Sequence, residues 1–386
     1  MRKVLVSIVA ASALASSLSA IEVYKEGNNF VDIYGDARAI AGYGHTMTFG
    51  KVGGVSSDAT INSNILFGVQ GNSRLGVKFR YNNFIGDVQL GANEQTLYNS
   101  GANNMGFRYL YAGYDFGDAG VFVVGKMDTP MVNNFSSSVF DTDGGMNGFG
   151  GYATGSRRIQ VQYKLPIGLT LAIIENDVAN NMYSVAIKDG QPNFTNFTTI
   201  PRVALSYEYK SKGTRARIAA TYARAESFST TRAKDAAAVN LGIKQDISEA
   251  FYVSGLLSYG FNGHLTGEQS IANPNVGNGI GSAMNAGSTS YADMGATSHI
   301  YAGFIELGGK LTEDFGIAVS GGYQLAAFKG DNHHSYGAFI QLPYKFNNNF
   351  SIVPHIGYYG VSTYTNSDSN TNIGGIFAMA QLKVNF

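Results

Sequence analysis

The sequence predicts an all-β protein, a transmembrane antiparallel β-barrel of about sixteen strands that closes on itself. Two observations carry this prediction. Apolar and polar residues alternate along many short segments, and no run beyond the N-terminal segment approaches the about 18 apolar residues of a membrane-spanning helix. The composition agrees, because the chain has 49 Gly, 24 Tyr and 24 Phe but only 14% charged residues, against roughly 25% in a soluble domain.

Residues 1–20 have the pattern of a secretory signal peptide. Arg2 and Lys3 precede an apolar stretch, and small residues that end at Ala20 follow it. This order of a basic, an apolar and a small-residue region is typical of a segment that signal peptidase removes. Cleavage after Ala20 and cleavage after Ser19 are both compatible with the sequence. We therefore expect a secreted protein.

The remaining residues, 21–386, are expected to form one barrel domain. Processing leaves 25 basic and 27 acidic residues, a nearly neutral balance, and the chain contains no Cys. A clustered basic surface, which a nucleic-acid partner requires, is not indicated. Without Cys the domain forms no disulfide. The sequence suggests no cofactor, no catalytic residue and no metal site.

Alternation with period two defines the predicted strands. In 74–81 basic residues and Gly occupy one phase while Leu, Val, Phe and Tyr occupy the other, and 158–165 and 202–210 behave alike. The predicted strands are 30–44, 64–81, 84–94, 105–116, 120–128, 156–165, 169–176, 202–211, 214–225, 236–246, 251–262, 298–311, 316–328, 334–346, 350–364 and 373–386. A further strand in MYSVAIK, residues 182–188, would favour eighteen.

Three features favour a membrane barrel over a soluble sandwich, which also alternates. The apolar phase carries almost no charge, as contact with lipid requires. Tyr and Phe recur near strand ends, where an aromatic girdle meets the membrane interface. Short and long connections alternate, as expected for tight periplasmic turns and long outer loops. Closure follows because an open sheet edge in hydrocarbon leaves backbone groups unpaired, and sixteen strands enclose an aqueous lumen.

Two long connections are the expected functional segments. Residues 129–155 contain Asp141 and Asp143 among Gly and small residues, although they belong to an early hairpin. Residues 263–297 are rich in Gly, Asn and Ser and are expected to be solvated. The alternative interpretation of the two carboxylates is that they only form turns, since Asp-Gly suits tight turns.

Several blocks of the sequence resemble the general diffusion porins of Gram-negative outer membranes. These blocks are NSRLGVKFRY (72–81), FRYLYAGYDFGDAGVFVVGKMDTP (107–130), SRRIQVQYKLP (156–166) and the C-terminal AQLKVNF. The resemblance implies an outer-membrane homotrimer of sixteen-stranded barrels whose third outer loop, 129–155, folds inward and constricts a water-filled channel. Small hydrophilic solutes and ions would diffuse through it, and outer-membrane lipids and lipopolysaccharide would surround it. The terminal Phe386 resembles the family's signal for the outer-membrane assembly machinery.

The same resemblance implies a basic cluster on the channel wall at Arg74, Arg108 and Arg158. Arg74 and Arg158 fall on the polar, inward phase of their strands. Arg108 shares its phase with Leu110, so alternation supports its inward position less. The alternative for each is an ordinary solvated wall residue, which is also the expectation for the other basic residues of these strands, Lys78, Arg80 and Lys164.

In two places the sequence departs from the family pattern. Asp36 stands where the family often has a basic residue, and Arg38, two residues later on the same face, is expected to replace it. The loop has FDTDGG in place of the family's PEFGG, so Asp141 and Asp143 are the expected acidic groups opposite the basic wall. These departures leave the sign of the ion selectivity open.

Two other functions are compatible with a barrel. Some outer-membrane barrels are hydrolases, but none of the six His stands beside a recognisable nucleophile motif such as GxSxG. A surface adhesin or structural barrel would use its long outer loops to bind a partner, and it would not need an inward loop. Channel conductance distinguishes these functions.

Overall fold

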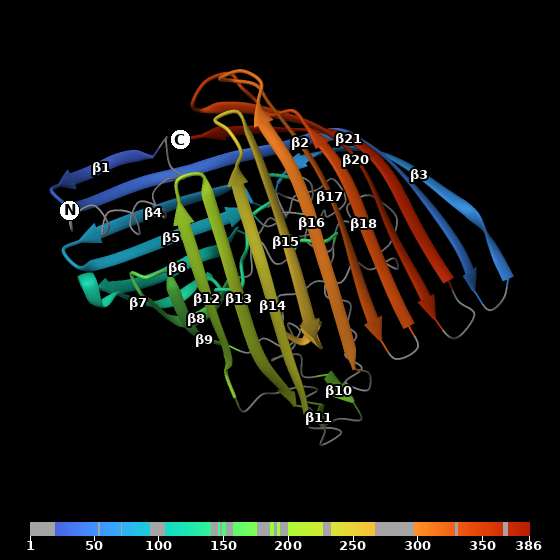
Figure 1. Cartoon of the computed structure of the whole chain (residues 1–386), viewed down its shortest axis with the longest axis horizontal. Helices are drawn as coiled ribbons and strands as arrows, with labels where there is room; N and C mark the ends of the chain where they lie inside the picture. The colour runs from blue at the N-terminus through green and yellow to red at the C-terminus, as the bar shows by residue number, and fades with distance from the viewer. Residues whose placement is uncertain are drawn as a thin grey trace.

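The structure, a computed structural model, describes residues 20–52, 55–70, 72–92, 105–139, 146, 149–151, 157–175, 186–188, 191–193, 200–226, 233–266, 297–328, 331–365 and 370–386. Strands account for most of them and form one antiparallel sheet that closes into a barrel (Figure 1). Within these ranges, no helix combines the length and the hydropathy needed to cross a bilayer.

The barrel strands follow one another around the sheet in chain order. They are β2 (Asn29–Val52), β3 (Val55–Val69), β4 (Arg74–Tyr81), β5 (Phe84–Ala92), β6 (Met105–Asp115), β7 (Val121–Asp128), β8 (Arg157–Lys164), β9 (Leu169–Ile174), β12 (Arg202–Ser211), β13 (Thr214–Glu226), β14 (Ala233–Asp246), β15 (Phe251–Phe261), β16 (Ser298–Lys310), β17 (Gly316–Phe328), β18 (Asp331–Gln341), β19 (Tyr344–Lys345), β20 (Phe350–Thr365) and β21 (Asn370–Asn385). Each pairs with its neighbours in an antiparallel register, which confirms the predicted fold class.

β2 closes the barrel because both of its edges are paired. On one edge β3 pairs with residues 39–52 and β4 continues in line along residues 30–36. On the other edge lies β21, and beyond it the backbones of Gly35 and Phe386 exchange hydrogen bonds of 2.9 and 3.0 Å. β18 and β19 are likewise one interrupted strand against β20. The described residues therefore form sixteen barrel strands, as predicted.

The segment 182–188 was the one that would have favoured eighteen strands, and its described part does not join the barrel. β10 (Ala186–Lys188) and β11 (Gln191–Asn193) pair with each other in a separate two-stranded sheet. The first hairpin, in contrast, is longer than predicted, since β2 continues past the expected end of 30–44. In residues 45–63 the phase that contains Met47, Phe49 and Ile61 also carries His, Lys and Ser residues, so the alternation is interrupted there. A short N-terminal strand, β1 (Ile21–Glu26), pairs with the start of β2.

Tight turns gather at one end of the barrel, as predicted. Asn82, Gly117 and Gly213 adopt φ values of 53°, 67° and 75°, the left-handed backbone that lets a chain reverse within a few residues. Gly117 opens the 3₁₀ turn η1 (Gly117–Ala119). The longer connections of the other end lie largely outside the described residues.

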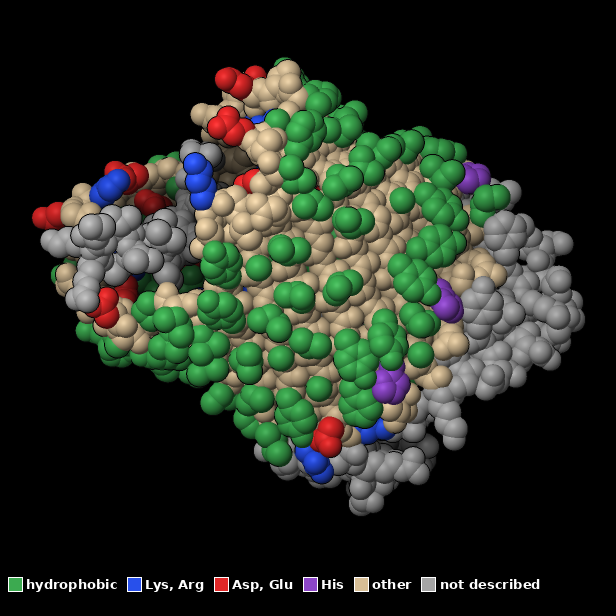
Figure 2. Space-filling model, viewed as in Figure 1, with side chains coloured by type: hydrophobic (Ala, Val, Ile, Leu, Met, Phe, Trp, Pro, Cys, Tyr) green, Lys and Arg blue, Asp and Glu red, His purple; other side chains and the backbone are tan. Residues whose placement is uncertain are grey.

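The two faces of the sheet differ as the alternation predicts. In β12, Val203 and Leu205 are 44% and 46% exposed, while Ala204 and Ser206 between them are 6% and 2% exposed. Figure 2 shows hydrophobic side chains spread over the front of the barrel, with Lys, Arg, Asp and Glu confined to its margins. An outer band without charge is the surface that a bilayer covers.

On the inner face, aromatic rings pack over glycines of the neighbouring strands. The ring of Tyr34 lies over Gly76 on the neighbouring strand, where a Cβ would come within 2.5 Å of the Tyr34 Cζ. Gly375 accommodates Tyr359 in the same way, at 2.6 Å. These glycines let large rings lie flat along the wall, so the lumen is not filled by side chains that stand upright.

Candidate functional site

The connection between β7 and β8 turns into the lumen over its described residues, as predicted. Residues 129–139 run along the inside of the barrel toward β18. Three loop carbonyls accept hydrogen bonds from inner-wall side chains, Pro130 from Arg217 at 2.8 Å, Met131 from Asn240 at 3.1 Å and Phe135 from Ser254 at 2.8 Å. Because these donors belong to β13, β14 and β15, the loop crosses to the wall opposite its own strands.

Glu306 of β16 holds the middle of the loop. Its side chain is buried, at 1% exposure, and its carboxylate accepts hydrogen bonds from Ser137 N at 3.0 Å, Ser136 Oγ at 2.9 Å and the Tyr252 hydroxyl at 2.9 Å. Gln341 of β18 donates to Ser137 O at 2.8 Å. Hydrogen bonds to a charged group contribute about 1.5–3 kcal/mol each, so Glu306 is a strong attachment point.

The returning half of the loop packs by apolar contact. Met146 and Phe149 are 0% exposed, and the Phe149 ring lies 6.0 Å from the Tyr359 ring. Gly150 has a φ of 103°, and a Cβ there would overlap the Gly303 carbonyl of β16. The backbone of the loop at residue 150 therefore lies directly against the wall. Only Gly can occupy this position, because any side chain would overlap β16.

The loop thus covers one side of the lumen, the inner faces of β14–β18 and β20, which we call the packed wall. Asp141 and Asp143 lie outside the described residues. Their predicted position opposite the basic side chains stays a prediction.

The other side of the lumen, the inner faces of β2 and β4–β8, carries most of the predicted site residues, and we call it the charged wall. Arg38 donates through Nε and Nη2 to the two oxygens of Asp36, at 2.7 and 3.0 Å. Arg74, the cross-strand neighbour of Asp36, donates through Nε at 2.8 Å. Asp36 is 5% and Arg38 7% exposed. One carboxylate thus fixes two guanidinium groups, and the cluster keeps a net positive charge.

Arg108 also lies on the inner wall, although the alternation of its strand does not predict this position. A β-bulge between β5 and β6 shifts the register beside it, and a bulge places one extra residue in a strand. Phe107 and Leu110 consequently both point outward, at 48% and 47% exposure. The Arg108 side chain lies over Gly91 of β5, and its Nε donates to Gln89 Oε1 at 3.0 Å.

A hydrogen-bonded chain that the sequence did not predict continues from Gln89. Its amide Nε2 donates to the Tyr34 hydroxyl at 2.7 Å, and this hydroxyl donates to Asp87 Oδ1 at 2.7 Å. The Lys78 ammonium lies 4.8 Å from the centre of the Tyr34 ring. Asp87 and Gln89 share the inward phase of a predicted strand, which is the pattern that could have found them. The chain links Arg108 to β2.

At the start of β8, Arg157, which was not among the predicted site residues, forms an ion pair with Asp128. Arg157 Nε lies 3.4 Å from Asp128 Oδ1, and its guanidinium carbon lies 5.4 Å from the centre of the Tyr109 ring. The Tyr109 hydroxyl donates to Asp128 Oδ2 at 2.7 Å. Arg158 is on the inward phase, and its Nη1 donates to Arg157 O at 3.3 Å. Both arginines therefore belong to the charged wall.

A cavity of about 430 Å³ lies between the charged wall and the beginning of the loop. Its charged lining comes from Asp36, Arg74, Lys78, Asp87, Asp128, Lys164 and Lys383. Lys78 and Lys164 were expected to be ordinary wall residues, and both line this cavity. Arg80 instead pairs with Asp115 at 3.0 Å. The cavity places mixed charges around a water-accessible space, with the basic groups in excess.

The described histidines bear on the hydrolase alternative. On the outer face, His45 Nδ1 lies 2.9 Å from Ser63 Oγ, a hydrogen-bonded pair of a base and a hydroxyl. A nucleophilic site also needs a group that orients the base. Within the described part of the chain, no carboxylate or amide side chain is hydrogen-bonded to this imidazole.

The C-terminal residue Phe386 completes the seam of the barrel. Its ring lies over Gly35, where a Cβ would come within 2.5 Å of the Phe386 Cζ, and its backbone continues the pairing of β21 with β2. The side chain is 39% exposed. Its role as an assembly signal stays a prediction.

Solved structures show the same fold. The outer membrane channel DcaP of Acinetobacter baumannii superposes with a TM-score of 0.61 at 16% identity, over 95% of this chain and 100% of that chain. In-vitro folded OmpT, an outer membrane protein of Vibrio cholerae, gives 0.54 at 15% identity over 95% and 100%. Its trimer form gives 0.50 at 16% over 93% and 99%. No protein-family description and no curated protein matches the sequence. The expected resemblance is thus confirmed at the level of the fold.

Proposed function

We propose that this protein is an outer-membrane porin, a water-filled channel for the passive diffusion of small hydrophilic solutes and ions. One observation carries the proposal. A closed sixteen-stranded barrel holds an inward loop that is fixed to one side of the lumen and faces a wall of charged side chains on the other. Sixteen strands enclose more space than side chains alone fill, and ionised side chains are stable there only if water reaches them.

The charges on the described inner wall favour anions. Basic side chains outnumber acidic ones: Arg38, Arg74, Lys78, Arg80, Arg108, Arg157, Arg158, Lys164, Arg202, Arg215, Arg217, Lys244 and Lys383 against Asp32, Asp36, Asp87, Asp115, Asp128, Glu208 and Glu306. Residues 21–386 carry 25 basic and 27 acidic residues, so the basic excess is confined to the lumen. Rings of one charge sign set the selectivity of a pore.

The loop would strengthen the influence of the basic side chains on ion selectivity, because it narrows the passage along the charged wall. Fixed charges act most strongly where low-dielectric walls exclude bulk water. With Asp141 and Asp143 on the loop side, the passage would carry a transverse field between loop carboxylates and wall guanidinium groups. Such a field orients polar solutes and disfavours apolar ones. The loop acids oppose the basic excess, so the preference for anions is expected to be moderate.

The location and assembly belong to the same proposal. A signal peptide at 1–20 would direct secretion, and the outer surface without charge would face outer-membrane lipids and lipopolysaccharide. The trimer form of the Vibrio cholerae protein supports a homotrimer. Deleting Phe386 should lower the outer-membrane yield while periplasmic secretion continues, because the assembly machinery would no longer recognise the chain end. An unchanged yield in membrane fractions would argue against this role.

The proposed function is tested by reconstitution into a planar bilayer. The purified protein should insert in discrete steps of ohmic conductance, and a gradient of KCl should give a reversal potential displaced toward chloride. Liposome swelling should show faster entry of small sugars than of larger ones. Absence of conductance in a preparation with β-type far-UV circular dichroism would contradict the channel and favour the adhesin alternative.

A further inference from the structure

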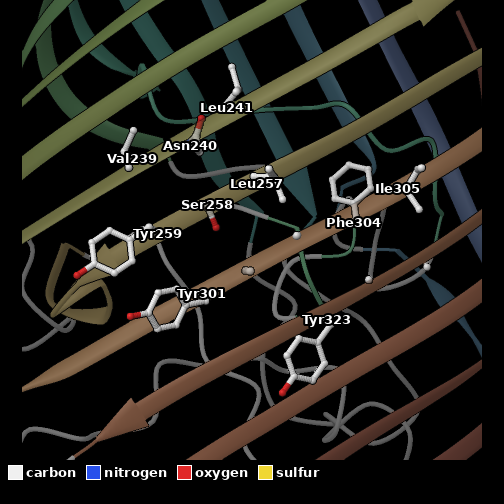
Figure 3. A pocket seen from close by; sticks show the side chains of 14 residues that line it. Val239, Asn240, Leu241, Leu257, Ser258, Tyr259, Tyr301, Phe304, Ile305 and Tyr323 are labelled. Atoms are coloured by element: carbon white, nitrogen blue, oxygen red, sulfur yellow. The ribbon is translucent and has the colours of Figure 1, made fainter.

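A groove lies on the outer face of the barrel, away from the lumen. It is a shallow groove of about 880 Å³ across β14–β17, with no charged residue in its lining. Gly321 of β17 contributes to its lining, and the Leu257 side chain lies over Gly303 of β16. Tyr301 and Tyr323 also line the groove (Figure 3). A Cβ on Gly321 would meet nothing closer than 3.8 Å. The depression therefore exists because a side chain is missing from an otherwise continuous apolar surface.

Two tyrosine–histidine pairs stand at the end of this groove that is nearer the long connections. The Tyr259 hydroxyl lies 2.9 Å from His299 Nδ1, and the Tyr323 hydroxyl lies 2.5 Å from His334 Nδ1. The ring centres are 6.1 and 6.0 Å apart. Figure 3 shows that the hydroxyls of Tyr259, Tyr301 and Tyr323 point toward the same side of the groove.

The two pairs repeat one arrangement. Tyr259 is the cross-strand partner of Tyr301, and His299 lies two residues before that partner. In the same way Tyr323 faces Tyr336 across the strands, and His334 lies two residues before it. When a tyrosine hydroxyl donates to Nδ1, the proton of a neutral imidazole resides on Nε2. When Nδ1–H donates instead, the remaining donor hydrogen belongs to the tyrosine hydroxyl. With either tautomer the repeat therefore places two donor groups, imidazole N–H or tyrosine O–H, at one end of an apolar groove.

We propose that this groove binds a phosphate-bearing lipid of the surrounding leaflet, with an acyl chain over Gly321 and the phosphate at His299 and His334. The inference rests on the proposed function, because it requires the outer face to lie in a membrane. An acyl chain fits a groove that has no charge in its lining and no side chain at Gly321. Imidazole N–H groups and tyrosine hydroxyls supply the donors that a phosphate accepts from. A second copy of the chain would gain nothing from polar donors confined to one end.

The test uses delipidated full-length protein in detergent and counts bound lipid by native mass spectrometry. The probes are dimyristoyl phosphatidylglycerol and dimyristoylglycerol, which share acyl chains and differ in the phosphate. The wild type should retain the phospholipid about tenfold better, the ratio that one hydrogen bond to a charged group produces. Gly321→Leu should reduce retention of both lipids, because leucine occupies the place of the chain. His299→Ala with His334→Ala should remove only the preference.

Matched controls lie elsewhere on the outer face. Ala112→Leu places a leucine on the outer face of β6, and His45→Ala removes an outer imidazole on β2, so both should retain lipid like the wild type. Equal retention by wild type and Gly321→Leu would overturn the proposal, and so would a change of oligomeric state in Gly321→Leu measured by light scattering, which would assign the groove to a second copy. Bilayer conductance of the same preparations separates the failures. Conducting channels without lipid preference refute this inference alone, whereas a wild type without conductance refutes the proposed function.

Discussion

The charged wall and the packed wall are built from the same kind of strand and differ in what their inward phase carries. On the charged wall the inward positions hold groups such as Arg74, Lys78 and Asp87. On the packed wall they hold apolar residues such as Phe304 and Phe339, which are 7% and 2% exposed, together with polar residues that hydrogen-bond to the loop. The outward phase is apolar on both walls. Inward composition therefore separates the wall that faces water from the wall that the loop covers.

This difference has a physical cause. An apolar inward residue in a water-filled lumen costs about 25 cal/mol for each Å² that it exposes, so the apolar inward residues of the packed wall need a cover inside the barrel. Met131, Phe135 and Phe149 of the loop supply it, in one cluster with Phe304 and Phe339. Under such a cover an ionised residue is stable only where it is hydrogen-bonded, as Glu306 is by Ser136 and Ser137. The loop docks where the wall is apolar and leaves the charged side to water.

The largest effect is expected from detaching the loop. Glu306→Ala removes the carboxylate that accepts hydrogen bonds from Ser136, Ser137 and Tyr252, at a cost of about 3 kcal/mol in the stability of the docked loop. The loop should leave the packed wall for part of the time. We expect larger and noisier single-channel currents. Glu313→Ala, on an exposed turn, is the control and should conduct like the wild type. Unchanged currents in Glu306→Ala would show that Glu306 does not hold the loop.

A smaller effect is expected from reversing charge on the side that faces water. Lys164→Glu together with Lys383→Glu turns two cavity-lining cations into anions, so the reversal potential in a tenfold KCl gradient should move toward potassium. A shift on the order of 10 mV is expected, against the about 59 mV of complete selectivity for a monovalent ion. Lys212→Glu at an exposed turn is the matched control. A shift of equal size in the control would mean that selectivity does not arise in the cavity.

The smallest effect is expected from the loop acids. Asp141→Asn with Asp143→Asn removes two negative charges from the expected loop side, so the reversal potential should move further toward chloride. Asp118→Asn, in the turn at the opposite end of the barrel, should leave it unchanged. If conductance and reversal potential both stay at wild-type values, the two carboxylates do not line the passage and serve only as turn formers.

The strand pattern could be predicted from the sequence because each strand of a barrel has two chemically different environments. Nine consecutive alternating residues, as in 202–210 of β12, define the phase of a strand. The prediction failed where one phase mixes apolar and polar residues. Beyond residue 44 the phase of Met47 and Phe49 also carries His45 and Lys51, so the continuation of the first hairpin to Val52 and its return from Val55 were not recognised from the alternation.

The site was predicted less completely, and Arg108 shows why. Its phase matched that of the outward Leu110, and only the bulge opposite Gln89 turns it inward. A bulge depends on how two strands pair, and this pairing cannot be read from the sequence of one strand. The chain from Gln89 through Tyr34 to Asp87 was missed for a similar reason, because β2 and β5 are separated by β4. Asp36, Arg38 and Arg74 were found because they are two residues apart or matched a recognisable block.

The division of the lumen into two walls can be measured directly, because the chain contains no Cys and a single introduced thiol reports on its own position. Lys164→Cys places the thiol on the cavity side, and Ser254→Cys places it beneath the loop, where Ser254 is 1% exposed and donates to Phe135 O at 2.8 Å. A charged methanethiosulfonate reagent should react with Lys164→Cys in open channels and reduce their conductance, and Ser254→Cys should react far more slowly. Equal reaction rates, or faster reaction at Ser254→Cys, would contradict the account that water and solutes pass along the charged wall.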